Sequence, residues 1–305
     1  MFMTGNPLIF GEVLFDCFDD NSRVLGGAPF NVAWHLRAFG LSPLLVSRVG
    51  DDPLGRQIRA AMDGWGLSTA GLQLDSVHPT GRVSVSLKAG EPSFDILDGA
   101  AYDYIQRDMI PPVTPSLIYH GTLALRSPDS AATLAHIRER YPAPVFMDIN
   151  LRPPWWDKPL LERYLPGVRW LKINENELDT LAGANGSVQS RVQRVMDNYQ
   201  ISLVILTRGG AGAMAVTADG AEVAVTPKRG TQVVDTVGAG DAFASVCIFG
   251  LASGWPMDST LDRAQSFASL IVSQRGATIA DPQPYLSLLQ QWDTALSDPF
   301  SGKED

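Results

Sequence analysis

The chain has 305 residues, of which 45% are hydrophobic and 19% are charged, as is typical of a globular protein with a large core. Its 24 basic and 33 acidic residues give a formal net charge of −9, which argues against a protein that binds nucleic acid through a broad basic surface. A small anionic ligand is not excluded, because a few backbone N–H groups hold phosphate even in an acidic protein.

A disulfide scaffold, a membrane span and a signal peptide are all unexpected. The two cysteines, Cys17 and Cys247, lie far apart and form no CxxC spacing. The most apolar stretch, residues 242–255, is shorter than the ~20 residues that a membrane helix needs. Residues 1–16 are apolar but lack the basic segment that begins a signal peptide. We therefore expect a soluble, cytoplasmic protein that does not interact with membranes.

Short apolar runs alternate with helical patterns along most of the chain. The runs are continuously rich in Val, Ile and Leu, as in strands buried on both faces of a parallel sheet: residues 44–49, 117–119, 145–149, 170–173 and 203–207. The helical patterns cover residues 30–39, 53–65, 130–141, 175–181 and 188–199. This alternation predicts βαβ units with right-handed crossovers, and hence an α/β fold.

Two segments depart from this alternation. Residues 80–87 are alternately polar and apolar, and with residues 93–96 they predict a half-exposed antiparallel hairpin. We expect residues 9–15 to supply a partner strand. Such a flap either pairs with a second copy of the chain or folds over its own site, and the sequence leaves both open. Residues 213–226 predict a second hairpin at the sheet edge.

Glycine and proline are enriched, and the glycines are clustered. The chain has 28 Gly and 21 Pro, where average usage gives about 21 and 15. Residues 234–245 read VDTVGAGDAFAS, which indicates a strand, a Gly-x-Gly turn and a helix. We expect the N–H groups of Ala239, Gly240 and Asp241 to be unpaired on the first helical turn, where they favour an anion.

Asp241 has two interpretations on the residues alone. A carboxylate beside an anion site would repel phosphate, so its presence favours a general base that deprotonates a hydroxyl during phosphoryl transfer. The alternative is an ordinary acidic residue at a helix start.

Residues 26–31 read GGAPFN and open a helix that ends at Gly40. Gly26 and Gly27 allow a ligand to approach the backbone, and Pro29 suits a first helical turn. Asn31 offers both a hydrogen-bond donor and an acceptor, as a sugar site needs.

Residues 26–33 and 235–243 resemble the two signature motifs of the PfkB (ribokinase-like) carbohydrate kinases, in the same order and spacing. The segments GDDPLG, DINLR and NENEL agree with this resemblance, which spans about residues 11–280. Within the family, GEVLFD, PTGRVSVSL, GEPSFDI and DINLRPPWWD are most similar to fructokinases.

The resemblance implies a fold and a domain organisation. Residues 1–305 would form a single ribokinase-like domain, a three-layer α/β/α sandwich with a mainly parallel central sheet. A small β-sheet lid would be built from about residues 9–25 and 80–97, and this lid could also form a homodimer.

The resemblance also implies an active site. Asp241 corresponds to the catalytic base, and the N–H groups of Gly238, Ala239 and Gly240 correspond to the anion hole. The residues expected to bind the sugar are Asp16, Gly27, Asn31 and Arg152, with Arg152 near either the sugar or a phosphate.

The nucleotide would lie on residues further along the chain. Asn174 and Glu177 match a motif near the phosphates, where Glu177 helps to hold Mg²⁺ through water. Thr207, Gly209 and Gly212 are the expected nucleotide contacts.

A monovalent-cation site is implied as well, and its occupant would be K⁺. Ala280 stands where some relatives place a hydroxyl, so K⁺ activation is left open. The implied ligands are Asp235 and the carbonyls of Val237, Ile271, Gln274 and Gly276.

The resulting hypothesis is an ATP- and Mg²⁺-dependent sugar kinase that phosphorylates a primary hydroxyl, that of fructose before others. Ribose, a nucleoside, 2-keto-3-deoxygluconate or a sugar phosphate are alternative substrates. A non-catalytic sugar- or nucleotide-binding regulator is the alternative of another class, although such a binder has no use for the base Asp241.

Three other features favour structural interpretations. Asp51 and Asp52 precede Pro53 and are expected to cap a helix rather than to bind metal. Trp155 and Trp156 could stack on a sugar, but the neighbouring prolines favour a packed loop. Cys247 is expected to be buried and unreactive.

Overall fold

The computed structural model describes residues 6–20, 22–88, 91–227, 230 and 232–292, with the backbone alone for residues 85–88 and 91–94. Its main element is a nine-stranded sheet with the order β13-β12-β11-β10-β9-β8-β1-β4-β5. These strands are β1 (Asn6–Phe10), β4 (Leu44–Gly50), β5 (Leu72–Asp75), β8 (Pro115–His120), β9 (Val145–Asp148), β10 (Val168–Asn174), β11 (Leu203–Thr207), β12 (Ala213–Thr217) and β13 (Glu222–Val225). All neighbours are parallel except β11–β12 and β12–β13, which form the expected edge hairpin.

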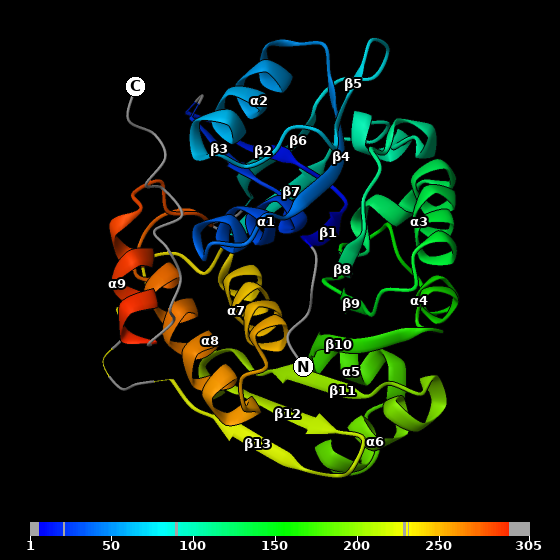
Figure 1. The fold of residues 1–305 in the computed structure, drawn as a ribbon, viewed down its shortest axis with the longest axis vertical. Helices are drawn as coiled ribbons and strands as arrows, with labels where there is room; N and C mark the ends of the chain where they lie inside the picture. Colours follow the sequence, from blue (N-terminus) through cyan, green and yellow to red (C-terminus); the bar gives the residue numbers. More distant parts are fainter. Residues whose placement is uncertain (1–5, 21, 89–90, 228–229, 231, 293–305) are drawn as a thin grey trace.

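Helices cover both faces of this sheet, as the α/β/α prediction requires (Figure 1). The α-helices are α1 (Ala28–Ala38), α2 (Pro53–Trp65), α3 (Pro128–Arg140), α4 (Lys158–Tyr164), α5 (Glu175–Ala182), α6 (Val188–Tyr199), α7 (Ala239–Ser253), α8 (Met257–Val272) and α9 (Gln283–Gln291). Short 3₁₀ helices lie at Ala101–Tyr104, Arg107–Met109, Leu123–Arg126 and Gly209–Ala211. The predicted α/β/α sandwich is confirmed.

A second, smaller sheet has the order β3-β2-β6-β7. Its strands are β2 (Leu14–Phe18), β3 (Arg23–Gly26), β6 (Gly81–Lys88) and β7 (Glu91–Ile96). The β6–β7 hairpin is antiparallel as predicted, and β2 pairs with β6 in parallel. In Figure 1 these strands lie in the upper half, away from β10–β13. The four strands form the small β-sheet that was predicted as a lid.

The prediction that residues 9–15 form one strand of the small sheet is wrong. Ile9 and Phe10 belong to β1 in the middle of the central sheet, and only residues from Leu14 onward enter the small sheet. Gly11 separates the two with a φ of 144°, and a Cβ there would lie 2.5 Å from the ring of Pro29. The apolar sequence continues through this break because both strands are buried, so hydrophobicity alone did not reveal it.

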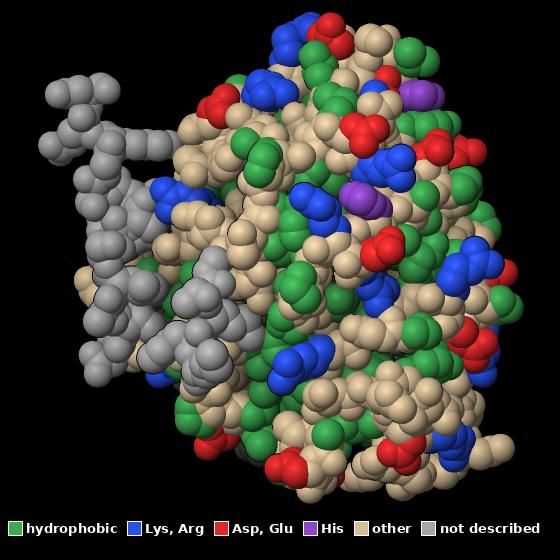
Figure 2. Space-filling view, turned by 45° about the vertical axis from the view of Figure 1, so that its right-hand side comes forward, with side chains coloured by type: hydrophobic (Ala, Val, Ile, Leu, Met, Phe, Trp, Pro, Cys, Tyr) green, Lys and Arg blue, Asp and Glu red, His purple; other side chains and the backbone are tan. Residues whose placement is uncertain are grey.

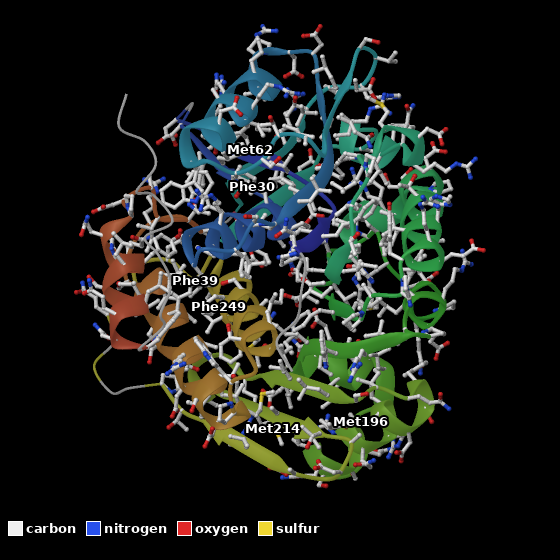
Figure 3. All side chains as sticks on the ribbon, in the orientation of Figure 1. Phe30, Phe39, Met62, Met196, Met214 and Phe249 are labelled. Atoms are coloured by element: carbon white, nitrogen blue, oxygen red, sulfur yellow. The ribbon has the colours of Figure 1, made fainter. Side chains whose placement is uncertain are left out.

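Two hydrophobic clusters pack on opposite faces of the central sheet. One joins the sheet to α1, α2, α7, α8 and α9, and the other joins it to α3, α4, α5 and α6. In the first, Phe39 meets Phe249 of α7 with ring centroids 5.5 Å apart (Figure 3). Phe39 also contacts Phe267, Tyr285 and Trp292. The contact with Phe249 packs the end of α1 against α7, the two helices whose first turns carry the signature motifs, and the other contacts join it to α8 and α9.

The distribution of charged side chains on the surface agrees with the expectation, drawn from the composition, that the protein has no broad basic surface. Figure 2 shows basic and acidic side chains interspersed over the face it presents, with no broad basic area among the described residues there. Within the described ranges, none of the helices combines the length and the apolar character that crossing a membrane would take.

Truncation of Phe39 tests how strongly this cluster stabilises the fold. Phe39 is fully buried, so Phe39→Ala should lower the free energy of unfolding by about 3–5 kcal/mol through lost burial and a residual cavity. Urea denaturation followed by circular dichroism measures this loss. Val77 is 80% exposed, and Val77→Ala should leave the midpoint unchanged; a loss below about 1 kcal/mol for Phe39→Ala would contradict the packing described.

Candidate active site

The carboxyl ends of parallel neighbours in the central sheet meet at one edge of the sheet. Glu12 follows β1, Asn150 follows β9, and Asn174 and Thr207 end β10 and β11. In an open α/β sheet, ligands bind outside this edge, because loops and helix starts converge there.

A cavity of about 630 Å³ opens at this edge. Its walls come from the small sheet, from the first turns of α1 and α7, and from the segments after β8 and β9. Eight of the predicted site residues line it: Asp16, Gly27, Asn31, Arg152, Val237, Gly238, Gly240 and Asp241. The two signature motifs, more than 200 residues apart in the chain, therefore share one cavity.

Helix α1 begins where the chain touches the segment after β1. Gly27 is the N-cap with a φ of 106°, and a Cβ there would lie 2.7 Å from the carbonyl oxygen of Glu12. Only glycine allows this approach. One turn later Asn31 is 3% exposed and lines the cavity.

Asn31 binds Asp241 directly. Its Nδ2 donates to Asp241 Oδ2 over 2.8 Å, and both side chains are buried. Asn31 Oδ1 is also buried, with no protein partner among the described residues. The sequence placed Asn31 in the sugar pocket but did not reveal this contact, which joins the first turn of α7 to α1.

Burial raises the pKa of Asp241 to about 6, although the hydrogen bond from Asn31 opposes the rise. The nearby carboxylate of Asp148 raises it further. Burial also raises the pKa of Glu12 to about 7 and that of Asp16 to about 6. Three carboxyl groups in one cavity thus have pKa values well above their usual range, a pattern common at functional sites.

The turn before α7 differs in one detail from the prediction. Gly238 adopts a φ of 78°, and a Cβ there would overlap Ala277. Gly240 is exposed at the cavity wall, but the N–H of Ala239 donates to the carbonyl of Thr236 over 3.3 Å. The prediction that the Ala239 N–H is unpaired is therefore wrong, because the turn that starts the helix closes on this group.

A buried ion pair beneath the turn was not predicted from the sequence. Lys172 of β10 lies beside Asp148 of β9 in the sheet register, and its Nζ donates to both carboxylate oxygens over 2.9 and 2.8 Å. The same Nζ is 3.4 Å from the position that a Cβ of Gly240 would occupy. A charged residue inside an otherwise apolar strand was the available signal.

Asn174 and Glu177 form a reciprocal cap at the start of α5. Asn174 Oδ1 accepts from the N–H of Glu177 over 3.0 Å, and Glu177 Oε2 accepts from the N–H of Asn174 over 2.8 Å. Glu177 Oε1 accepts from the N–H of Leu151 over 3.0 Å. Because both oxygens already accept backbone hydrogen bonds and Glu177 is 4% exposed, the geometry fits contact with a metal through water rather than direct ligation.

The residues expected to contact nucleotide form a separate row and do not line the cavity. Thr207 is the β11 neighbour of Asn174, and its Oγ1 donates to the carbonyl of Ile173 over 3.3 Å. Gly209 has open space beside it, but a side chain at Gly212 would overlap the backbone of Val225 in β13. Packing therefore explains Gly212 as well as a ligand would.

Two of the residues expected at the monovalent-cation site, Val237 and Gly276, donate hydrogen bonds to Asp235. Its Oδ1 accepts from the N–H of Val237 over 3.0 Å, and its Oδ2 accepts from the N–H of Gly276 over 3.1 Å. The N–H of Gln274 donates to the carbonyl of Ile271 over 3.2 Å. The described residues include no cluster of three or more His, Cys, Asp or Glu side chains suited to a metal, so a cation here would depend on carbonyl oxygens.

The structural interpretations of the remaining motifs are confirmed except for Asp51, which does not cap the helix and instead lies 3.5 Å from the guanidinium of Arg56. Asp52 caps α2 by accepting from the N–H of Gly55 over 2.8 Å. Trp155 packs against the core with Arg126 4.5 Å above its ring, and Trp156 packs beside it outside the cavity. Cys247 is completely buried.

The cavity also contains residues that we did not single out in the sequence. Glu12 and Asn150 line it, and Asn150 adopts a positive φ of 47° that non-glycine residues rarely take. Each lies two residues beyond the end of a central strand. Their place at the carboxyl edge of the sheet was the signal that would have revealed them.

Replacement of Asp241 tests the cost of its buried charge. The pKa of Asp241 is raised from 3.8 to about 6, so the folded protein binds the proton of this carboxyl group more tightly than the unfolded chain does. The protonated group therefore contributes to stability below pH 4, and this contribution is lost as the pH rises through 6. Asp241→Asn should therefore be more stable than the parent at pH 8, by about 3 kcal/mol.

Urea midpoints between pH 4 and pH 8, without ligand, measure this difference. It should shrink toward zero at pH 4. Asp108→Asn is the control, because the side chain of Asp108 is 91% exposed. This variant should be no more stable than the parent at either pH. A less stable Asp241→Asn at pH 8 would contradict the account.

Comparison with known proteins supports the geometry. The chain is 31% identical over 301 residues to a fructokinase from Klebsiella pneumoniae, with 92% of this chain and 97% of that protein covered. It is 26% identical over 279 residues to a 5-dehydro-2-deoxygluconokinase from Bacillus velezensis, with 86% and 83% covered.

A solved structure is similar over nearly its whole length. The fructokinase from Vibrio cholerae in its fructose, ADP and calcium ion bound form superposes with a TM-score of 0.80 at 25% identity, over 94% of this chain and 99% of that chain. A double mutant of the same enzyme was solved in a fructose, ADP and potassium ion bound form.

The family model described as pfkB family carbohydrate kinase matches residues 17–284. This match includes both signature motifs and most of the cavity wall. The chain belongs to the pfkB family of carbohydrate kinases.

Proposed function

We propose that residues 1–305 act as one ATP-dependent kinase that phosphorylates a primary hydroxyl of fructose. One observation carries the proposal: Asp241 lies at the start of α7, inside a cavity large enough for a sugar, and is held there by Asn31. A carboxylate in this position has a role in catalysis that it would not have in a protein that only binds sugar.

In this mechanism Asp241 accepts the proton of the sugar hydroxyl. The hydroxyl oxygen then forms a bond to the γ-phosphorus of ATP while the bond to the β-phosphate oxygen breaks, and ADP leaves. The backbone of Gly238 and Gly240 faces the cavity and would stabilise charge on the transferring group. Lys172 beneath Gly240 adds a fixed positive charge, although Asp148 largely neutralises it.

ATP would lie along the row formed by Asn174, Thr207 and Gly209, beside the sugar cavity. The first two are neighbours in the sheet register. Mg²⁺ bound with ATP would neutralise phosphate charge, and Glu177 would hold it through water. The small sheet, which supplies Asp16 to the cavity wall, would exclude water that otherwise competes with the sugar for phosphate.

The charge of the cavity favours a neutral sugar over an acidic one. Among the described residues, those with charged side chains that line it are Glu12, Asp16 and Asp241, with Arg152 as the one cation. The carboxylate of a 5-dehydro-2-deoxygluconate, or the phosphate of a sugar phosphate, would bring a further negative charge beside these acids. Fructose has no such group, so we place it before the other substrates.

K⁺ is proposed as an activator through the carbonyls near Asp235. Asp235 holds Val237 and Gly276 together, and Val237 lines the cavity close to the turn before α7. A cation there would fix this turn. Ala280 provides no hydroxyl, so only carbonyls and Asp235 would hold it.

A homodimer through the small sheet and a cytoplasmic location stay predictions. β3 and β7 are the edge strands of this sheet, and one side of each is free of a strand partner in the described part of the chain. Pairing of such edges between two copies is a common route to a dimer.

A panel assay with Asp241→Asn tests the proposed function. ADP release from ATP should be fastest with fructose, compared with ribose, a nucleoside, 2-keto-3-deoxygluconate, 5-dehydro-2-deoxygluconate and fructose phosphate. Asp241→Asn should lower kcat by about 10³-fold, within the range for loss of a general base, while thermal shifts by ATP and fructose persist. Asp108→Asn is the control and should leave kcat unchanged.

Near-normal turnover by Asp241→Asn would overturn the mechanism. A different preferred sugar would overturn the choice of fructose only. Thermal shifts without ADP release from any sugar would favour a binding protein.

A further inference from the structure

Glu12 is a buried acidic residue of the cavity to which the proposed mechanism gives no role. It lies between β1 and β2, is 4% exposed and lines the cavity together with Asn31 and Asp241. Its carbonyl oxygen is the atom that forbids a side chain at Gly27. Glu12 is therefore held tightly against the start of α1.

The two oxygens of the Glu12 carboxyl group have different surroundings. Burial raises the pKa of this carboxyl group, and the backbone N–H groups of Glu12 itself and of Ala28, the first residue of α1, oppose the rise. Oε2 is buried and has no partner among the described residues. A buried carboxyl oxygen without a partner is costly, and native structures rarely keep one unless a ligand or water satisfies it.

A second unpartnered oxygen lies in the same cavity. Asn31 uses Nδ2 for Asp241, which leaves its buried Oδ1 without a partner among the described residues. Two unpartnered acceptors thus accompany Asp241. Burial is the main cause of the raised pKa of Glu12, and the negative charge of Asp241 raises it further. A ligand that satisfies both acceptors needs hydroxyl groups besides the one that reacts.

We propose that Glu12 is a further sugar-binding residue, whose Oε2 accepts a hydrogen bond from a sugar hydroxyl other than the one that Asp241 deprotonates. Asn31 Oδ1 accepts from another hydroxyl in the same way. The site therefore selects a neutral, polyhydroxylated sugar. This inference rests on the proposed function, because it takes the cavity to be the sugar site.

Glu12→Gln tests the proposal with little change in shape. The amide retains one carbonyl oxygen but replaces the other oxygen with an NH₂ group, which donates and does not accept. At pH 8 the KM for fructose should rise about 10- to 100-fold, the loss expected for one hydrogen bond to a charged group. The KM for ATP should not change, kcat should change less than about threefold, and the thermal midpoint should not fall.

Two variants serve as references. Glu162→Gln makes the same chemical change on the exposed face of α4 and should leave every parameter unchanged. Glu12→Asp retains the charge but withdraws the carboxyl group by one methylene, and it should also raise the KM for fructose. It keeps the test valid if Glu12→Gln does not fold.

Fructose analogues that each lack one hydroxyl show whether Glu12 contacts the sugar or only supports the start of α1. One of these analogues lacks the hydroxyl that Glu12 binds. Its binding to the parent protein should be weaker than that of fructose, by about the same factor as Glu12→Gln weakens the binding of fructose. The same removal should cost nothing further in Glu12→Gln, because the two changes delete one interaction. A purely structural role would instead weaken all analogues by the same additional factor.

Isothermal titration with fructose distinguishes failure of this inference from failure of the proposed function. Unchanged fructose affinity in Glu12→Gln, or uniform additive losses, would overturn the role of Glu12 and leave the kinase proposal intact. If the parent protein prefers another sugar in the panel, the choice of fructose falls, and the same comparison with that sugar decides the role of Glu12. Binding of no sugar by the parent protein would overturn both.

Discussion

The hydrogen bond between Asn31 and Asp241 joins the two parts of the chain on which the site depends. Its 2.8 Å length connects the first turn of α1 to the first turn of α7 across a separation of 210 residues. The contact between Phe39, which ends α1, and Phe249 near the end of α7 holds the other ends of these helices together. Because the helices meet at both ends, Asp241 is fixed before any ligand arrives, as preorganised catalysis requires.

This arrangement concentrates negative charge in a buried place. Glu12, Asp16 and Asp241 share the cavity, and burial raises the pKa of all three. The structure offsets the charge only in part, since Arg152 is exposed and Lys172 is already paired with Asp148. The cavity is therefore suited to hydroxyl donors and unsuited to anionic sugars. Its three buried carboxyl groups lower the stability of the fold, a cost that functional sites commonly carry.

The sequence predicted the architecture well because its signals were local. The buried strands and most helices have the periodicity and flanking residues expected of them, and α2 and α6 match the predicted ranges from first to last residue. The glycine turns were also recognisable, since Gly27 and Gly238 adopt conformations that other residues avoid. The two motifs were placed in one site by resemblance to a family, not by local patterning.

The errors and omissions concern contacts between distant segments. The break at Gly11 lies inside a continuous apolar stretch, so the first strand was assigned to the wrong sheet. The Ala239 N–H is used by its own turn, which depends on backbone geometry that the sequence does not specify. Lys172 and Glu12 each left a signal in the sequence, but the partner of Lys172, Asp148, becomes visible only once β9 and β10 are known to be neighbours.

A crystal structure with fructose and a non-hydrolysable ATP analogue tests the central claim most directly. The account predicts a primary hydroxyl of fructose within hydrogen-bond distance, about 3 Å, of the Asp241 carboxylate. It also predicts the γ-phosphate against the backbone of Gly238 and Gly240. A sugar bound elsewhere, or one whose reacting hydroxyl faces away from Asp241, would contradict it.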